Sequence, residues 1–158
     1  MAAVSISDLQ KYVGKPITDI CENEFSTTKQ NHCAHFVGHV MEIQLGMLCG
    51  DMKYKTRKTG GSIRCDELYN RLSQRGPWEE RPTQSDGVLI FALAVHNVVN
   101  GIMLKVPEKH VGIHYAGRVY NFSNSQHKVV ADVSVDAFHK KFKATYAGNV
   151  ALFYGVVP

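Results

Sequence analysis

The hydrophobic pattern changes its period near Gly76, and this change limits the fold more than any other feature of the chain. Before Gly76, apolar residues recur at the three-and-four spacing of helices; after it, they form short β-branched and aromatic runs bounded by turn residues. Helices followed by hairpin-connected strands are typical of an α+β domain. We therefore predict an α+β fold in which N-terminal helices pack on one face of a C-terminal antiparallel sheet.

Three helices are predicted before the change of period. The first is capped by Ser7, with Gln10 completing a capping box, and ends at Gly14. The second begins at Cys33 and stops near Gly46, and the third covers residues 63–75. Gly-Pro at positions 76 and 77 is expected to terminate the third helix.

The second half of the chain carries strand and turn signals. Asn100-Gly101 is a strong two-residue hairpin signal, and a second hairpin is expected around Ala116-Gly117. Ser134 is expected to cap a short helix between the last two strands. The predicted strands cover residues 87–95, 102–106, 111–115, 118–122, 128–133 and 149–157.

Length and composition favour one ordinary domain over residues 1–158. A chain of 158 residues can bury one full core, and 44% apolar with 20% charged residues is close to average globular usage. The net charge of +4 is spread along the chain, with its densest basic cluster confined to residues 53–58. We therefore expect no nucleic-acid partner, because nucleic-acid binding requires a larger basic face.

The N-terminal residues carry neither a basic start nor a long apolar run, so we expect no secretory signal peptide. No stretch approaches the roughly 20 apolar residues of a membrane-spanning helix. The protein is accordingly expected in the cytoplasm of the cell that makes it, or to leave by a route that does not read an N-terminal signal.

Four cysteines, Cys21, Cys33, Cys49 and Cys65, contain no CxxC pair. This spacing excludes a zinc ribbon and a dense disulfide framework. Cys49 and Cys65 could pair if the protein works outside the cytoplasm, and the sequence leaves that redox state open. We expect Cys21, Cys49 and Cys65 to take no part in the chemistry.

Cys33 differs from the other cysteines because it falls at the predicted start of a helix. Unpaired N–H groups and the helix dipole stabilise a thiolate there, which lowers the pKa of the thiol and creates a nucleophile. The alternative is that Cys33 is a small buried apolar residue, as free cysteines often are.

A thiolate nucleophile requires a base, and His110 at the start of a predicted strand is the best candidate. His114 lies on the same strand face but roughly 13 Å farther along, so only one of the two can reach Cys33. Asn121 lies on the partner strand of the predicted hairpin, where it could hold the imidazole in place. We therefore predict Cys33, His110 and Asn121 as catalytic residues.

The ordered set of motifs resembles the NlpC-like branch of papain-like cysteine peptidases. The set comprises Cys33 before a helix, DGVLIF at 86–91, HVGI beginning at His110, and GRVYN ending at Asn121. The resemblance implies a papain-like, NlpC-type fold with Cys33 as nucleophile, His110 as base and Asn121 as orienting residue. The aromatic residue of the family's oxyanion region has no counterpart here, and Gln30 lies too close to Cys33 to replace papain's glutamine.

By the same resemblance the protein is a thiol-dependent amidase or peptidase that hydrolyses amide bonds in peptidoglycan stem peptides, with no cofactor and no metal. Delivery to a rival's periplasm as an antibacterial effector would fit a bare catalytic domain, and an immunity protein would then be a partner. A protein-directed deamidase or protease with the same Cys-His site is the alternative enzyme. A non-catalytic binding protein on this scaffold is the alternative without chemistry.

NHCAHFV at residues 31–37 also resembles the NCEHFV motif of lecithin-retinol acyltransferase-like proteins. Those proteins carry the catalytic histidine before the cysteine, in a circularly permuted order. Here His110 follows Cys33, so the unpermuted, peptidase-like order is favoured.

Other candidates have ordinary structural explanations. His32, His35 and His39 share helical spacing that could bind zinc, but no glutamate completes an HExxH motif, so we expect no metal. His35 could alternatively support the active site. Trp78 could line a substrate groove or cover the core, and Asp86 could lie near the cleft or form a turn before a strand.

Overall fold

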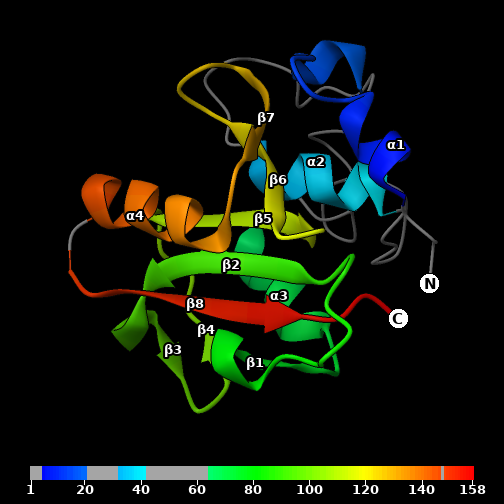
Figure 1. Ribbon diagram of the computed structural model, residues 1–158. Helices are drawn as coiled ribbons and strands as arrows, with labels where there is room; N and C mark the ends of the chain where they lie inside the picture. Colours follow the sequence, from blue (N-terminus) through cyan, green and yellow to red (C-terminus); the bar gives the residue numbers. More distant parts are fainter. Residues whose placement is uncertain (1–4, 21–31, 42–63, 147) are drawn as a thin grey trace, which may run out of the picture.

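The computed structural model describes residues 5–20, 32–41, 64–146 and 148–158. Its centre is a six-stranded sheet in which every neighbouring pair is antiparallel (Figure 1). The α+β class is therefore confirmed. In sheet order the strands are β1 (Arg75–Pro77), β8 (Val150–Gly155), β2 (Leu89–Ala94), β5 (Lys109–Tyr115), β6 (Arg118–Ser123) and β7 (Lys128–Asp132).

Helices cover both faces of this sheet. Leu89, Phe91 and Leu93 of β2 join the core formed with α1 (Ile6–Gln10), α2 (Cys33–Val40) and α3 (Cys65–Arg71). The intervening Ile90 and Ala92 join a second core with α4 (Val135–Thr145). The N-terminal helices therefore pack on one face as predicted, whereas α4 covers the opposite face, where the sequence predicted no helix. All six residues of β2 are buried, and such a continuous apolar strand needs cover on both sides.

The first two helices begin close to the predicted positions. Ser5 rather than Ser7 caps α1: its hydroxyl accepts from the Asp8 backbone N–H at 3.2 Å, and the Asp8 carboxylate accepts from the Ser5 N–H at 3.0 Å. The predicted Ser7–Gln10 capping box is therefore wrong. Helix α2 begins at Cys33 as predicted, and the part predicted beyond Met41 lies outside the described residues.

Helix α3 is shorter than predicted at both ends. It covers Cys65–Arg71 and stops because Leu72 takes an extended backbone conformation. Arg75–Pro77, placed at the end of that helix by the sequence, instead forms the edge strand β1 beside β8. An edge is the position in a sheet that tolerates proline, since Pro77 has no N–H to donate.

Both predicted hairpin turns form, but one joins a different pair of strands. Ala116 and Gly117 have φ angles of 50° and 79° and connect β5 to β6, as expected for a two-residue turn. Asn100-Gly101 joins β3 (Val98–Val99) and β4 (Ile102–Met103), a small separate sheet. The single-turn helices are η1 (Ile17–Asp19), η4 (Trp78–Glu80) and η5 (Val95–Asn97).

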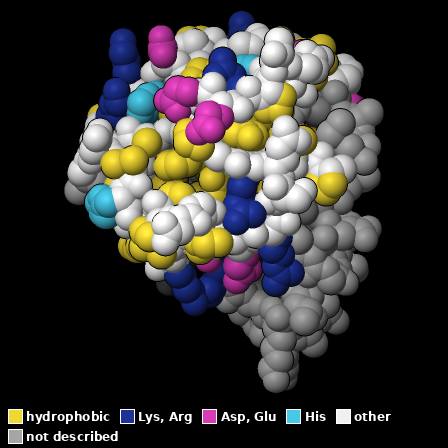
Figure 2. All heavy atoms as spheres, turned by 90° about the horizontal axis from the view of Figure 1, so that it is seen from below, with side chains coloured by type: hydrophobic (Ala, Val, Ile, Leu, Met, Phe, Trp, Pro, Cys, Tyr) yellow, Lys and Arg dark blue, Asp and Glu magenta, His cyan; other side chains and the backbone are white. Residues whose placement is uncertain are grey.

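The small β3–β4 sheet lies at the lower end of the molecule in Figure 1 and exposes apolar side chains. In the view from below, hydrophobic side chains gather among charged ones (Figure 2). The exposed apolar residues in this part of the chain are Val95, Val99, Ile102 and Leu104.

Helix α4, with 11 residues, is the longest in the described part of the chain. No described helix combines the length and the apolar character needed to cross a bilayer.

The cap of α4 gives a test of the second helical layer. The Ser134 hydroxyl accepts from the Ala137 backbone N–H at 3.0 Å, as the sequence predicts. Ser134→Ala should lower the free energy of unfolding by about 1 kcal/mol in urea denaturation followed by circular dichroism, because one helical N–H loses its partner. Ser134→Asp keeps an acceptor and should lose less; an equal loss in both variants would contradict a capping role.

Candidate active site

The Cys33 side chain lies where α2 meets the start of β5. Cys33 is the first residue of α2, is 1% exposed, and accepts a hydrogen bond from the Val111 backbone N–H. Helix α2 packs on both β5 and β6. The β5–β6 pairing covers only Ile113–Tyr115 of β5, so the beginning of β5 is not engaged in that ladder and Val111 can turn its N–H to the sulfur.

The surroundings of Cys33 favour its thiolate. Burial alone would raise the pKa of the thiol, because a charged sulfur loses its hydration. A hydrogen bond from Cys65, the positive charge of His110, and hydrogen bonds from His110 and Val111 outweigh burial and hold the Cys33 pKa well below its usual range. A cysteine in this state carries the charge that a nucleophile needs at neutral pH.

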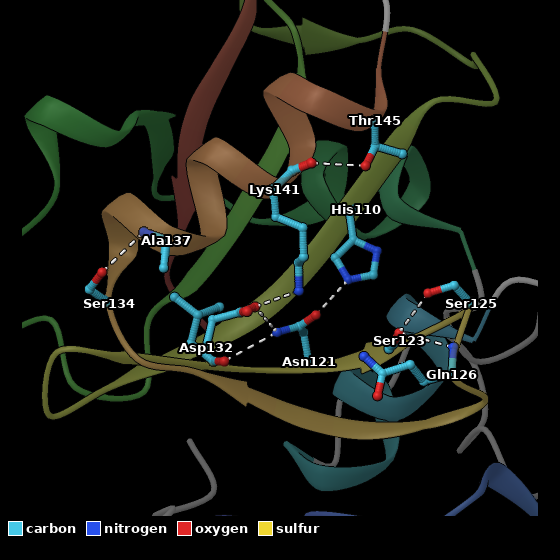
Figure 3. Close-up of polar contacts among 11 residues, drawn as sticks. His110, Asn121, Ser123, Ser125, Gln126, Asp132, Ser134, Ala137, Lys141 and Thr145 are labelled. Carbon is cyan, nitrogen blue, oxygen red and sulfur yellow. Dashed lines mark hydrogen bonds and ion pairs between the residues drawn. The ribbon is translucent and has the colours of Figure 1, made fainter.

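His110 is held by a ring stack on one side and a hydrogen bond at its edge. Its ring stacks on Phe142 of α4 at a centroid distance of 4.4 Å, and its Nε2 lies 2.9 Å from Asn121 Oδ1 (Figure 3). The expected proximity of His110 and Asn121 is thus confirmed. Because an amide oxygen only accepts, Nε2 carries the hydrogen, and Nδ1 is left to exchange a proton with Cys33.

Two acceptors fix which end of the Asn121 amide faces His110. Asn121 Nδ2 donates to the Val119 carbonyl at 3.1 Å and to Asp132 Oδ2 at 2.9 Å. Reversing the amide would place its oxygen against these two oxygens. Lys141 Nζ in turn lies 2.7 Å from the same Asp132 oxygen, so a chain of contacts runs from α4 through β7 and β6 to His110 (Figure 3).

Gly112 makes room for this contact. A Cβ at position 112 would lie 2.8 Å from Val119 Cγ1, closer than real Cβ atoms come, and 3.0 Å from both Asn121 Cβ and the Tyr120 carbonyl oxygen, which is tighter than most real contacts. Only glycine therefore lets β6 approach closely enough for the Asn121 amide to reach across to His110. Gly112 belongs to the HVGI motif, but the motif alone did not predict that a side chain is excluded at this position.

Cys65 lies directly beside Cys33, which the sequence did not predict. The two sulfur atoms are 3.4 Å apart, and both cysteines are buried with reduced thiols. The hydrogen bond to Cys33, burial and the negative charge of Cys33 raise the pKa of Cys65, so Cys65 is the partner that keeps its proton. The expectation that Cys65 takes no part in the site is wrong, because α3 begins at Cys65 and contacts α2.

A cavity of about 400 Å³ opens on the α4 side of His110. Cys33 is not among its lining residues, so the cavity reaches the site from the histidine side. Tyr146 lies at its wall; burial and then the negative charge of Cys33 raise the pKa of Tyr146, which leaves a neutral phenol able to donate. The lining comprises Pro107, Glu108, His110, Asn121, Ser123, Asn124, Ser125, Gln126, Lys141, Phe142, Thr145 and Tyr146.

The three helical histidines do not converge on one point. His32 and His35 are buried with their Nδ1 atoms 3.2 Å apart, whereas His39 packs edge-on against Tyr12. Within the described residues, no three metal-ligating side chains from His, Cys, Asp or Glu gather in one place. His32, His35 and His39 are therefore packed among helix and strand side chains.

The remaining candidates have structural roles. Trp78 is buried in the α4-side core and packs on His114 at 5.3 Å, so it covers the core rather than a groove. His114 Nδ1 lies 2.9 Å from the Ser85 carbonyl, which leaves His110 as the histidine at Cys33.

Asp86 accepts from the Ala116 N–H at 2.8 Å and thereby fixes the β5–β6 turn. Gln30, Cys21 and Cys49 lie outside the described residues.

The lowered pKa of Cys33 predicts selective alkylation. Iodoacetamide should modify Cys33 faster than Cys65 below pH 7, because Cys65 holds its proton. His110→Ala removes a positive charge and a hydrogen bond, so the inflection of the Cys33 pH–rate profile should move to higher pH. Mass spectrometry of the modified peptides gives both rates.

His114→Ala is the matched control for this experiment, because His114 contacts Ser85 and Trp78 instead of Cys33. Its profile should match that of the wild type. Equal alkylation rates at both cysteines, or the same profile after His110→Ala, would contradict activation of Cys33 by His110.

Comparison of the chain with models of protein families, with curated proteins and with solved structures found no match. The chemistry of the site is therefore argued from the side chains and distances described above.

Proposed function

We propose that the protein is a cysteine amidase or peptidase, a thiol-dependent hydrolase of amide bonds. One observation carries the proposal: a buried Cys33 at the start of α2, its pKa lowered by a hydrogen bond from Cys65 and by His110, whose imidazole is oriented by Asn121. A packing cysteine would gain nothing from a histidine with a fixed tautomer. A nucleophile requires both features.

In the proposed mechanism, His110 Nδ1 holds the proton released by Cys33, and the thiolate attacks the amide carbonyl carbon. The backbone N–H of Cys33 donates to the developing oxyanion. When the C–N bond breaks, His110 gives its proton to the leaving nitrogen and a thioester remains on Cys33. His110 then takes a proton from water, the resulting hydroxide attacks the thioester, and the carboxylic acid and Cys33 are released.

The surroundings of His110 support this sequence of proton transfers. Stacking on Phe142 and the 2.9 Å contact to Asn121 keep the ring in one orientation while it gains and loses a proton. The Asp132 carboxylate, which is paired with Lys141, accepts from the Asn121 amide and so keeps the amide oxygen turned toward the imidazole. The cavity beside His110 offers space for the substrate next to the proton donor.

The substrate we propose is the peptide stem of peptidoglycan, on the resemblance of the motif set to NlpC-like peptidases. Delivery into the periplasm of a rival cell would bring the enzyme to this substrate. An immunity protein in the producing cell would then protect it. These assignments rest on the motifs at Cys33, His110 and Asn121 together.

Digestion of purified peptidoglycan tests the proposal. Wild-type protein should release peptide fragments detectable by mass spectrometry, and Cys33→Ala should release none, because the alanine side chain cannot form a thioester. Cleavage that persists in Cys33→Ala would overturn the thiol mechanism. Absence of cleavage by the wild type would overturn the peptidoglycan assignment and favour a protein substrate or a binding function.

The roles of His110 and Asn121 predict different losses of turnover. His110→Ala removes the base and should reduce kcat on the order of a hundredfold or more. Asn121→Ala removes the oriented acceptor but leaves the base, so its loss should be clearly smaller. Fragment-release rates at saturating substrate measure both values, and equal losses would mean that Asn121 does more than orient the ring.

A further inference from the structure

We propose that Cys33 and Cys65 form a redox pair, which a small hydroperoxide converts into a disulfide that reversibly switches the site off. The effect on activity rests on the proposed hydrolase function, whereas the formation of the disulfide does not. The two cysteines therefore make up an oxidative modification site built into the junction of α2 and α3.

The placement of the two sulfur atoms carries the inference. They lie 3.4 Å apart, and each belongs to the first residue of a helix, α2 for Cys33 and α3 for Cys65. The two helices contact each other. A disulfide requires a separation of about 2.05 Å, so a small adjustment of the side chains and of the short helix α3 would bring the sulfurs together.

The reaction balances with a hydroperoxide as the oxidant. The Cys33 thiolate attacks one peroxide oxygen; the O–O bond breaks, the departing hydroxide takes a proton and leaves as water, and Cys33 becomes a sulfenic acid. The Cys65 thiolate then attacks the Cys33 sulfur, the S–O bond breaks, and the oxygen leaves as a second water with the proton from Cys65. Overall, two thiols lose two electrons and two protons, and the peroxide is reduced to water.

The local charges favour this order of events. Cys65 keeps its proton mainly because it donates to the Cys33 thiolate and faces its negative charge. Oxidation of Cys33 to a neutral sulfenic acid removes that charge. The ammonium group of Lys109, which lowers the pKa of Cys65, remains and now favours the Cys65 thiolate. Burial and the Asp66 carboxylate continue to raise the pKa of Cys65, so oxidation of Cys33 makes Cys65 a better nucleophile by removing the largest of the causes that hold its proton.

Burial determines which oxidant can act and what product results. Cys33 is 1% exposed and Cys65 3% exposed, so a small, uncharged oxidant such as hydrogen peroxide reaches the pair most readily. A buried sulfenic acid meets the neighbouring thiol before it meets further peroxide. The pair is thus expected to stop at the disulfide instead of continuing to the irreversible sulfinic acid.

Disulfide mapping after treatment with hydrogen peroxide tests the pairing directly. Trypsin leaves Cys33 and Cys49 in one peptide, so a second cleavage after Glu42 is needed to separate them. With free thiols blocked before digestion, the peptide of Cys33 should be linked to the peptide of Cys65, and dithiothreitol should separate them. A link from Cys65 to Cys49 or Cys21, or a sulfinic Cys33 beside a reduced Cys65, would overturn the proposal.

Cys65→Ser supplies the matched variant, because its hydroxyl can still donate to Cys33 but cannot form a disulfide. Under the same treatment Cys33 should gain two oxygen atoms, a mass increase that dithiothreitol does not reverse. Cys49→Ser should leave the Cys33–Cys65 link unchanged. A disulfide that Cys33 forms just as fast with another cysteine in Cys65→Ser would show that Cys65 is not the resolving residue and would overturn the proposal.

Peptidoglycan digestion separates this proposal from the proposed function. Wild-type activity should fall with disulfide formation and return with dithiothreitol, whereas Cys65→Ser should not recover. A mapped Cys33–Cys65 disulfide in a protein that never cleaves peptidoglycan would support the redox pair and reject the substrate. Cleavage that continues in protein with the disulfide fully formed would overturn the switch.

Discussion

The burial of β2 on both faces is the constraint on which the rest of the structure depends. The run from Leu89 to Ala94 has no solvent-facing side, so it requires one helical layer with α2 and α3 and another with α4. Strand β5 lies beside β2 and is therefore between the two layers. Cys33 comes from one layer and Phe142 from the other, and His110 contacts both.

Polar contacts then determine how the His110 imidazole is oriented within this packing. The stack on Phe142 alone would not determine which ring nitrogen of His110 carries the hydrogen, because a ring stack involves neither nitrogen in a hydrogen bond. The contact with Asn121 Oδ1 places the hydrogen on Nε2. Asp132 and the Val119 carbonyl in turn determine the orientation of the Asn121 amide. The Asn121 amide oxygen contacts His110, its amide nitrogen donates to two oxygens, and Asp132 also contacts Lys141, so the orientation of the Asn121 amide is unambiguous.

The sequence predicted the parts of this arrangement that depend on local chemistry. Turn residues located the β5–β6 hairpin, and the hairpin places Asn121 within reach of His110; the pattern after Cys33 located the start of α2. The position of α4 on the opposite face and the Cys33–Cys65 contact depend on how distant segments pack, which periodicity does not encode. The continuous apolar run of β2 did carry a signal for two covered faces.

Gly112 also bears on how related chains can be identified. A cysteine before a helix, a histidine in a strand and an asparagine in the next strand are common enough to occur together by chance. A glycine at position 112 is a stricter criterion, since a Cβ there would clash with Val119 and lie too close to Asn121. A chain that has the three polar residues but a larger residue at this position would need a different spacing between its two strands.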